Sequence, residues 1–289
     1  MNSQLVQKIR QYEKNFSKGQ KLIAKYIEEH YDKVAFMTAS KLGTTVGVSE
    51  STVVRFATEI GYSGYPGLQQ AMQEMIRNRL TSVQRLEITS NNIPVEGLLD
   101  ASIGQDIDIV KRTLENVDRN EFYKAADAIA KSEKIYILGA GSSHALATFL
   151  KHYMNLIFDN VVLLDESSEA MVLQQLMKVS DKDAVIVISF PRYSKRAVKA
   201  IQYSTSKGAC TVAVTDIKDS PLAKFAKYSI FAKSDMVSFV DSLVAPLSLI
   251  NALIVTVAIK RKEDLQNNLK NLEAIWDEYS VYEKIEENN

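Results

Sequence analysis

The chain has 289 residues, of which 46% are hydrophobic and 24% are charged, so its composition excludes a disordered or fibrous protein. Its 35 basic and 35 acidic residues cancel, and its single cysteine, Cys210, excludes an intramolecular disulfide and fits a reducing compartment. The first residues, MNSQLVQKIRQYEKNF, lack the apolar core of a signal peptide, so we expect a cytoplasmic protein.

The charge is unevenly distributed along the chain. Residues 1–90 carry 12 basic and 8 acidic residues, a net charge of +4, whereas residues 91–289 carry 23 and 27, a net charge of −4. Apolar residues in the first part recur at helical spacing, which predicts an all-α domain over 1–80. A polar stretch with Pro94, Gly97 and Gly104 predicts a linker over 81–105, followed by a second domain over 106–289. The two domains are expected to have different partners.

The segment TASKLGTTVGVSESTVVRFATEIGYSGY (38–65) has the pattern of a helix-turn-helix. Thr38 and Ser49 are suitable N-caps for two helices separated by a turn at Gly47. The second helix would bury one apolar face and expose Ser51, Thr52 and Arg55, which suit a DNA major groove. Lys41 would neutralise phosphate charge. A plain three-helix packing unit with a solvated outer face remains the alternative.

Beyond residue 106 the pattern changes to alternating helices and apolar strands. Strands are predicted at 134–138, 160–164, 184–189, 210–214 and 228–232, and helices at 142–157, 168–178, 194–206, 220–226, 239–260 and 263–284. Continuous apolar strands separated by helices indicate an α/β domain with a parallel five-stranded sheet of the flavodoxin or Rossmann-like type.

The last two predicted helices raise separate questions. The apolar run 242–259 is long enough for a membrane span, but Pro246, Asn251 and Thr256 favour a core helix, and no membrane partner is expected. The final predicted helix carries an apolar stripe. This stripe is either an oligomer surface or a face that packs on the chain's own sheet. Its members are Leu265, Leu269, Leu272, Ile275 and Trp276.

The stretch ILGAGSSHALA (137–147) predicts a strand, a tight turn and a helix, with bare N–H groups available for an anion. One interpretation is a dinucleotide site, with Gly139, Gly141 and Asp165 as its markers. However, His144 occupies the third glycine position, so close helix–strand packing would be lost there. The alternatives are an anion site with hydroxyls from Ser142 and Ser143, and a structural turn without a ligand.

A second strand end favours the anion site. In VIVISFPRYSKRAV (185–198), Ser189 ends a strand, Ser194 begins a helix and Arg192 lies in the loop between them. Hydroxyls and a cation at a neighbouring strand end suit a negatively charged ligand of an open α/β sheet. Lys195, Arg196 and Lys199 are interpreted as a solvated helix face.

Residues along most of the chain resemble the RpiR/MurR family of bacterial transcription regulators. In the first domain the matching residues are Ser49, Ser51, Thr52, Arg55, Phe56, Gly61, Tyr62, Gly64 and Tyr65. The second domain resembles the SIS (sugar isomerase) domain, whose Gly-x-Gly-x-Ser turn matches Gly139, Gly141 and Ser143. Its Ser-x-Ser-Gly-x-Thr turn matches Ser189 and Ser194, but Pro191 and Arg192 replace the middle Ser and the Gly.

The resemblance implies a DNA-binding regulator of sugar metabolism whose SIS domain senses a sugar phosphate, or a sugar acid because an arginine fork also suits a carboxylate. It implies operator contacts by Lys41, Ser49, Ser51, Thr52, Arg55 and Tyr62. The expected effector residues are Gly139, Gly141, Ser142, Ser143, His144, Glu166, Ser189, Arg192 and Ser194. A homodimer or homotetramer is expected, because one helix-turn-helix reads too few bases.

An aldose–ketose isomerase is the alternative function. Such an enzyme needs a general base, for which Glu166, Glu169 and His144 lie near the expected cleft. Nothing in the sequence marks one of them as a base, and the attached helix-turn-helix favours sensing. We therefore predict that the chain is not an enzyme and that it uses no metal and no cofactor.

Overall fold

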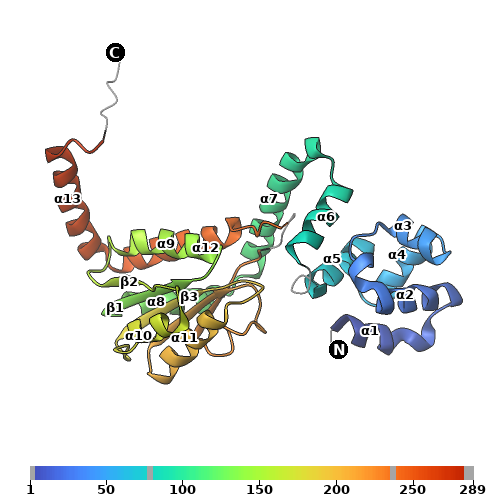
Figure 1. Cartoon of the computed structure of the whole chain (residues 1–289), viewed down its shortest axis with the longest axis horizontal. Coiled ribbons are helices and arrows are strands. Elements are labelled where there is room, and N and C mark those ends of the chain that lie inside the picture. The colour runs from blue at the N-terminus through green and yellow to red at the C-terminus, as the bar shows by residue number, and fades with distance from the viewer. Residues whose placement is uncertain (1–3, 77–80, 235–238, 283–289) are drawn as a thin grey trace, which may run out of the picture. The chain divides into compact units, whose positions relative to one another are not determined.

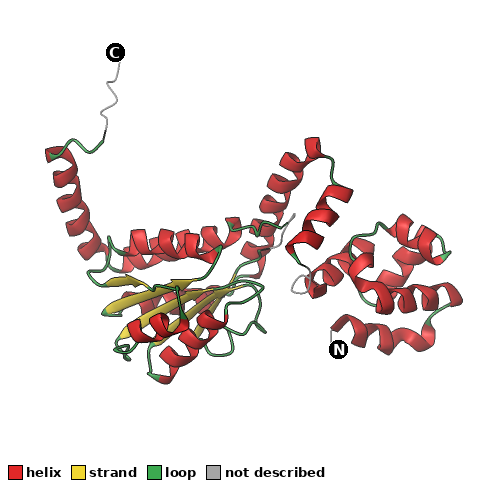
Figure 2. Cartoon of the chain, viewed as in Figure 1, coloured by secondary structure: helices red, strands yellow, loops and turns green. Residues whose placement is uncertain are grey.

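The computed structural model describes residues 4–76, 81–234 and 239–282, and the chain divides into two compact units that meet in sequence at Asn92 and Ile93 (Figure 1). The first unit is helical, and the second contains a β-sheet covered by helices (Figure 2). The predicted domain ends at residues 80 and 289 lie outside the described residues.

The first unit contains six α-helices among its described residues and a short 3-10 helix, Glu13–Asn15. The α-helices are α1 (Gln4–Tyr12), α2 (Lys18–Val34), α3 (Ala39–Val46), α4 (Glu50–Glu59), α5 (Tyr65–Ile76) and α6 (Ser82–Asn92).

Local capping produces the helix-turn-helix formed by α3 and α4. The Thr38 hydroxyl accepts the Lys41 N–H (3.1 Å), and Gly47 ends α3 at a φ of +76°, a conformation that favours glycine. The Ser49 hydroxyl then accepts the Thr52 N–H (3.3 Å) at the start of α4. The predicted caps and turn are therefore confirmed.

The buried face of α4 anchors it in the core of the first unit. Val53, Phe56, Ala57 and Ile60 are fully buried. The ring of Phe56 packs at 5.1 Å from that of Phe16. This packing fixes which face of α4 remains outside.

The second unit contains a 3-10 helix, Val95–Gly97, five strands and the remaining helices. Its strands are β1 (Lys134–Gly139), β2 (Val161–Leu163), β3 (Asp183–Ile188), β4 (Cys210–Thr215) and β5 (Tyr228–Phe231). Its α-helices are α7 (Leu98–Asn116), α8 (Arg119–Ala130), α9 (Ser143–Met154), α10 (Glu169–Gln175), α11 (Lys195–Ser206), α12 (Val244–Lys260) and α13 (Lys262–Glu278).

The sheet is parallel throughout and has the order β2-β1-β3-β4-β5, which confirms the predicted α/β architecture. Alternate strand residues face opposite layers. Ile135 and Ile137 pack with α8, α9 and α12, whereas Tyr136 and Leu138 pack with α10 and α11. The strand order reverses between β1 and β3, where ligands of open α/β sheets bind.

Two predicted segments differ from the structure. The expected helix at 220–226 is a series of turns, in which the N–H groups of Phe225 and Ala226 both donate to the Leu222 carbonyl oxygen (3.1 Å). The interval 81–105 contains α6 and the start of α7, because Pro94 and Gly97 interrupt the helical chain only locally.

The final helices also differ from expectation. The apolar helix α12 buries only one face, and α13 has no buried residue. The predicted end of the last helix, 283–284, lies outside the described residues. Among the described residues, no single helix meets the length and apolarity needed to cross a membrane; α12 and α13 meet them only together, across a bend of 99°.

Candidate functional site

The outer face of α4 carries a group of hydroxyls at its N-terminus. The Ser49 hydroxyl oxygen lies 2.9 Å from that of Ser51 and 2.8 Å from that of Thr52. Ser51 is exposed and Thr52 is half-buried. These residues lie together on the exposed face at the start of α4, as the periodicity predicted.

Arg55 follows one turn later on the same face. Its Nε donates to the Ser51 carbonyl oxygen (3.2 Å), which lays the exposed side chain along the helix toward the hydroxyls. Lys41 is exposed on α3, whereas Tyr62 lies beyond the other end of α4, half-buried beneath the ammonium group of Lys8 (4.2 Å to the ring centroid). Tyr62 is thus separated along the helix from the other predicted DNA contacts.

The second group of predicted site residues lies at the carboxyl ends of β1 and β3. Gly139 and Ile188, the last residues of these strands, are paired in the sheet. The turn 140–142 and the loop 189–194 therefore start side by side, and they lead into the N-termini of α9 and α11. Both helix ends direct backbone N–H groups to this edge of the sheet.

Gly139 permits close contact between β1 and α9. A Cβ at this position would lie 2.3 Å from the Ser143 carbonyl oxygen and 2.9 Å from the Ala147 Cβ. Close helix–strand contact is therefore made at Gly139, while His144 occupies the third glycine position of the dinucleotide pattern. Gly141 has a φ of +61° and open space around it, as a tight turn near a ligand requires.

The serines of the two turns are described by their burial and by the hydrogen bonds that they accept. Ser143 and Ser189 are buried, with exposed fractions of 3% and 4%. The Ser189 oxygen accepts the Ser194 N–H (3.2 Å), and the Ser194 oxygen accepts the Ala197 N–H (3.4 Å). A hydroxyl that accepts a bond can still donate its own hydrogen, so both groups can serve an anion.

Arg192 adopts a left-handed backbone conformation with a φ of +67°. The SIS pattern has glycine at this position, and glycine adopts this conformation without strain. For arginine, which has a Cβ, the same conformation costs about 1–2 kcal/mol. Next to it, the Tyr193 hydroxyl donates to Asp216 (2.7 Å) and ties the loop to the end of β4. The loop is thus held in place while it carries an exposed, strained arginine.

Glu166, which follows β2, connects the three strand ends. Its carboxylate Oε1 lies 3.6 Å from Nδ1 of His144, at the start of α9. Its main-chain carbonyl oxygen accepts a hydrogen bond from Arg196, in the first turn of α11. Arg196 is exposed, as the sequence indicated, and it also makes this contact with the loop. Lys199 lies on the exposed face in an ion pair with Glu169 (2.7 Å).

Two acidic residues near the turns accept hydrogen bonds from neighbouring residues. The Asp165 carboxylate accepts the Ser167 N–H (2.8 Å), and this bond holds the pKa of Asp165 below its usual value. Because this carboxylate is already bonded to its own loop, it is less suited to bind the ribose of a dinucleotide. Asp241, which the sequence did not single out, accepts a hydrogen bond from Ser142 (3.4 Å) across 99 positions of sequence.

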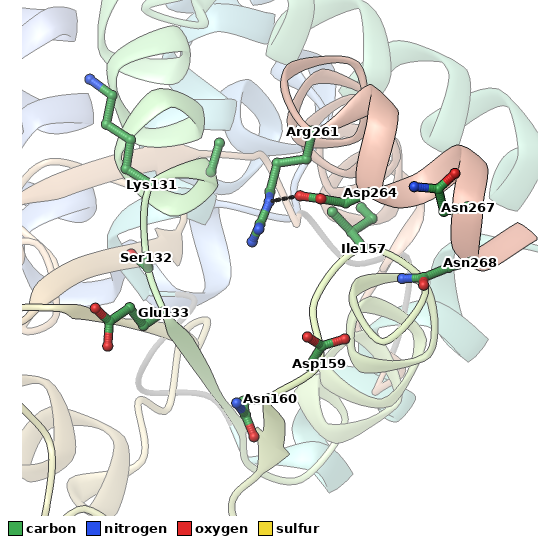
Figure 3. A pocket seen from close by; sticks show the side chains of 11 residues that line it. Lys131, Ser132, Glu133, Ile157, Asp159, Asn160, Arg261, Asp264, Asn267 and Asn268 are labelled. Atoms are coloured by element: carbon green, nitrogen blue, oxygen red, sulfur yellow. Dashed lines mark hydrogen bonds and ion pairs between the residues drawn. The ribbon is translucent and has the colours of Figure 1, made fainter.

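A polar cavity of about 440 Å³ lies at the opposite edge of the sheet, where β1 and β2 begin (Figure 3). Its walls include Arg261 and Asp264, joined at 2.8 Å, and Asn268, whose amide donates to the Leu156 carbonyl oxygen (3.1 Å). The cavity contains none of the predicted effector residues, so it does not coincide with the site at the carboxyl ends of the strands.

Two family models match the chain. Residues 3–79 match the helix-turn-helix domain of the rpiR family, and residues 128–256 match the SIS domain. The first range contains α3 and α4, and the second contains the whole sheet and both ligand turns.

Curated relatives with the same arrangement are transcription regulators. HexR, an HTH-type transcriptional regulator of Escherichia coli, is 26% identical over 277 residues, which cover 92% of each chain. An uncharacterised HTH-type transcriptional regulator of Clostridium perfringens is 24% identical over 267 residues, 90% of this chain and 94% of the relative. These relatives support the prediction that the chain is not an enzyme.

Solved structures show the same fold. The sugar isomerase domain of an RpiR transcription factor from Sphaerobacter thermophilus has a TM-score of 0.59 and 25% identity, covering 62% of this chain and 99% of that domain. NanR of Vibrio vulnificus, solved with ManNAc-6P, has a TM-score of 0.56 and 20% identity, covering 94% and 98% of the two chains. With an rpiR-type helix-turn-helix followed by a SIS domain, the chain belongs to the RpiR family of transcription regulators.

Proposed function

We propose that this DNA-binding regulator of sugar metabolism recognises its operator through α4 and senses a sugar phosphate or sugar acid at the carboxyl ends of β1, β2 and β3. On α4, Ser51 and Thr52 would contact phosphates or base edges, and Arg55 would grip a guanine or a phosphate. Lys41, Ser49 and Tyr62 are proposed as further DNA contacts.

One observation carries the effector proposal: the turns after β1 and β3 begin side by side, and Glu166 links them through His144 and Arg196. Two helix N-termini and the hydroxyls of Ser143, Ser189 and Ser194 then surround one location. An anion there would receive backbone N–H and hydroxyl hydrogen bonds together. Gly139, Gly141 and Ser142 would shape the turn, and His144 and Glu166 would contact sugar hydroxyls.

Arg192 is proposed to select the anionic group. A guanidinium binds phosphate or carboxylate with two parallel hydrogen bonds. The left-handed backbone at Arg192 sets the direction in which the loop carries this side chain. The similarity to NanR, which was solved with ManNAc-6P, supports a phosphorylated sugar. The substitution of glycine by arginine in the second turn leaves a sugar acid as the other candidate.

The regulator is proposed to act in the cytoplasm as a homodimer or homotetramer on a two-fold operator. Effector binding would close the cleft between the turns and change the spacing of the two DNA-binding domains. An isomerase is less favoured, because Glu169 is engaged by Lys199 and the curated relatives are regulators.

A thermal-shift screen of sugar phosphates and sugar acids tests the effector site on the full chain. A ligand at 100 times its Kd should raise the free energy of unfolding by about 2.7 kcal/mol. The same ligand should give a much smaller shift with Arg192→Ala, and an unchanged shift with the control Lys199→Ala. If no sugar phosphate or sugar acid produces a shift, or if Arg192→Ala shifts as the native chain does, the proposal fails.

A further inference from the structure

Ser142, in the turn after β1, has a hydroxyl group that takes no part in capping its own helix. The residue is the N-cap of α9, but its side chain makes no capping hydrogen bond within that described helix. At the starts of α4 and α11, by contrast, a serine hydroxyl does accept a helix N–H. The Ser142 hydroxyl instead donates to the Asp241 carboxylate (3.4 Å). A serine hydroxyl has one hydrogen to donate, so Asp241 and a bound anion would compete for it.

The carboxylate of Asp241 is an unexpected neighbour for a turn that would bind an anion. Like a phosphate or carboxylate effector, it is a negatively charged acceptor of hydrogen bonds. Asp241 is half-buried and lies in the segment 239–243, which leads into α12. A bound anion would repel this carboxylate, because like charges close together destabilise one another where water is partly excluded. Binding of an anionic effector therefore favours departure of Asp241 from the turn.

The residue after Asp241 is bonded to another helix. The Ser242 hydroxyl donates to the Asp106 carboxylate of α7 (2.6 Å), a contact across 136 positions of sequence. The second unit begins at Ile93, and α7 is its first α-helix, so the chain leads from the first unit almost directly into α7. The segment 239–243 thus contacts both the turn of the effector site and the helix that follows the DNA-binding unit.

The segment 239–243 is less firmly packed than the helices beside it. Ile109 and Thr113 of α7 are buried, and α12 packs on the sheet through its inner face. Phe239 and Val240, in contrast, are exposed by 50% and 62%. Parts of a protein with few buried apolar contacts move at the lowest cost in free energy. Movement of this segment therefore requires no unpacking of the core.

We infer that Asp241 is an internal substitute for the effector: it holds the Ser142 hydroxyl when no effector is bound, and the effector displaces it. Release of Asp241 would move the adjacent Ser242 and break its bond to Asp106, which would loosen α7. The inference rests on the proposed function, because it assigns a route by which the effector site would act on the DNA-binding unit.

A direct contact between Asp241 and an effector hydroxyl is the competing role. The two roles predict opposite effects of Asp241→Ala. If Asp241 is displaced, the variant should bind the sugar phosphate with the largest thermal shift about 3- to 10-fold more tightly, because a competing acceptor is gone. Asp159→Ala, at the opposite edge of the sheet, is the matched control and should bind as the native chain does. Weaker effector binding by Asp241→Ala would assign Asp241 to the effector itself and overturn the inference.

Hydrogen exchange of the full chain measures the effect on α7. Ser242→Ala should speed amide exchange around Asp106 about 10-fold, the factor expected for one lost hydrogen bond. Asp241→Ala should do the same without effector, and the sugar phosphate should do so in the native chain. Ser248→Ala is the matched control, because its hydroxyl bonds within α12 to the Val244 carbonyl oxygen (2.9 Å). Unchanged exchange in α7 for either Ser242→Ala or Asp241→Ala would contradict the inference.

Binding measurements on the same variants keep this inference separable from the proposed function. Ser242→Ala should bind the effector as the native chain does, but the effector should change its operator Kd by less than about 2-fold, against about 5- to 150-fold in the native chain. If the variants speed exchange in α7 but no sugar phosphate or sugar acid binds, the proposed function alone fails. If effector and operator bind while exchange in α7 does not respond to the variants, the inference alone fails.

Discussion

The two candidate sites differ in how they are built. The DNA-binding residues Ser51, Thr52 and Arg55 lie on one helix, and the packing of Phe56 on the opposite face is enough to turn them outward. The effector residues come from three strand ends, and contacts such as the hydrogen bond from Tyr193 to Asp216 hold their loops in place. A site on one helix depends mainly on that helix, whereas an assembled site depends on the packing of the whole domain around it.

The largest effect on stability and on effector binding is expected at Gly139, which both packs against α9 and belongs to the effector site. Gly139→Ala would force its Cβ against the Ser143 backbone, which should destabilise the second unit by about 3 kcal/mol and abolish the effector thermal shift. Gly104→Ala is the matched control, because its Cβ meets no atom within 4 Å, and alanine in a helix should stabilise by about 0.5–1 kcal/mol. Urea denaturation measures both; equal stabilities of the two variants would contradict the account.

Alkaline pH should weaken the first unit through Tyr65. Its buried hydroxyl donates to the Met37 carbonyl oxygen (2.8 Å), and burial raises the pKa of Tyr65 from 10.0 to about 12. Since the folded pKa exceeds the unfolded one, the stabilisation is complete below pH 10 and is lost as the pH rises through 12. The loss should reach about 2–3 kcal/mol.

Chemical denaturation followed by circular dichroism at a series of pH values measures this loss. The Tyr65→Phe variant lacks the titrating group and should show a flatter dependence over the same range. A native chain whose pH dependence matches that of Tyr65→Phe would show that the hydroxyl does not titrate with folding.

Single contacts on α4 should cost less and leave the second unit unaffected. Arg55→Ala should weaken operator binding by about 10- to 100-fold at fixed salt, with the effector thermal shift unchanged. Arg55→Lys distinguishes a phosphate contact from a base contact. The variant should retain most of the operator affinity if Arg55 contacts a phosphate, and lose most of it if Arg55 binds guanine. Fluorescence anisotropy on an operator selected from random duplexes measures both, and unchanged affinity in Arg55→Ala would remove α4 from the interface.

The smallest expected effect on stability is at Arg192. Arg192→Gly should raise the free energy of unfolding by about 1 kcal/mol, because glycine adopts the left-handed conformation without strain. It should also weaken effector binding, as should Arg192→Ala, which keeps the strain and gains no stability. A lower melting temperature for Arg192→Gly than for the native chain would contradict the strained-loop interpretation.

The sequence predicted the features that depend on short-range patterns. The caps at Thr38 and Ser49, the buried face of α4 and the five parallel strands all follow from local spacing and propensity. It also identified the turns around Gly141 and Arg192, but not the side-chain contacts that join them. Arg196 and Asp241 meet their partners only through the tertiary fold, across 30 and 99 positions of sequence, and no periodicity encodes such contacts.

The helices that the sequence described least well are α12 and α13. An apolar run indicates burial but not on how many sides, and only the fold shows that α12 uses one face. The two interpretations of the α13 stripe could not be separated from spacing alone. The structure shows that Leu265 packs against the core of the second unit, whereas no residue of α13 is fully buried.

The most direct measurement of the central claim is the affinity of the full chain for its selected operator, with and without a saturating amount of the sugar phosphate that gives the largest thermal shift. Coupling between the two sites predicts a change of about 5- to 150-fold in the operator Kd, and its loss in Arg192→Ala. An operator affinity that is identical with and without the saturating sugar phosphate would contradict the claim that these strand ends form the sensor of the regulator.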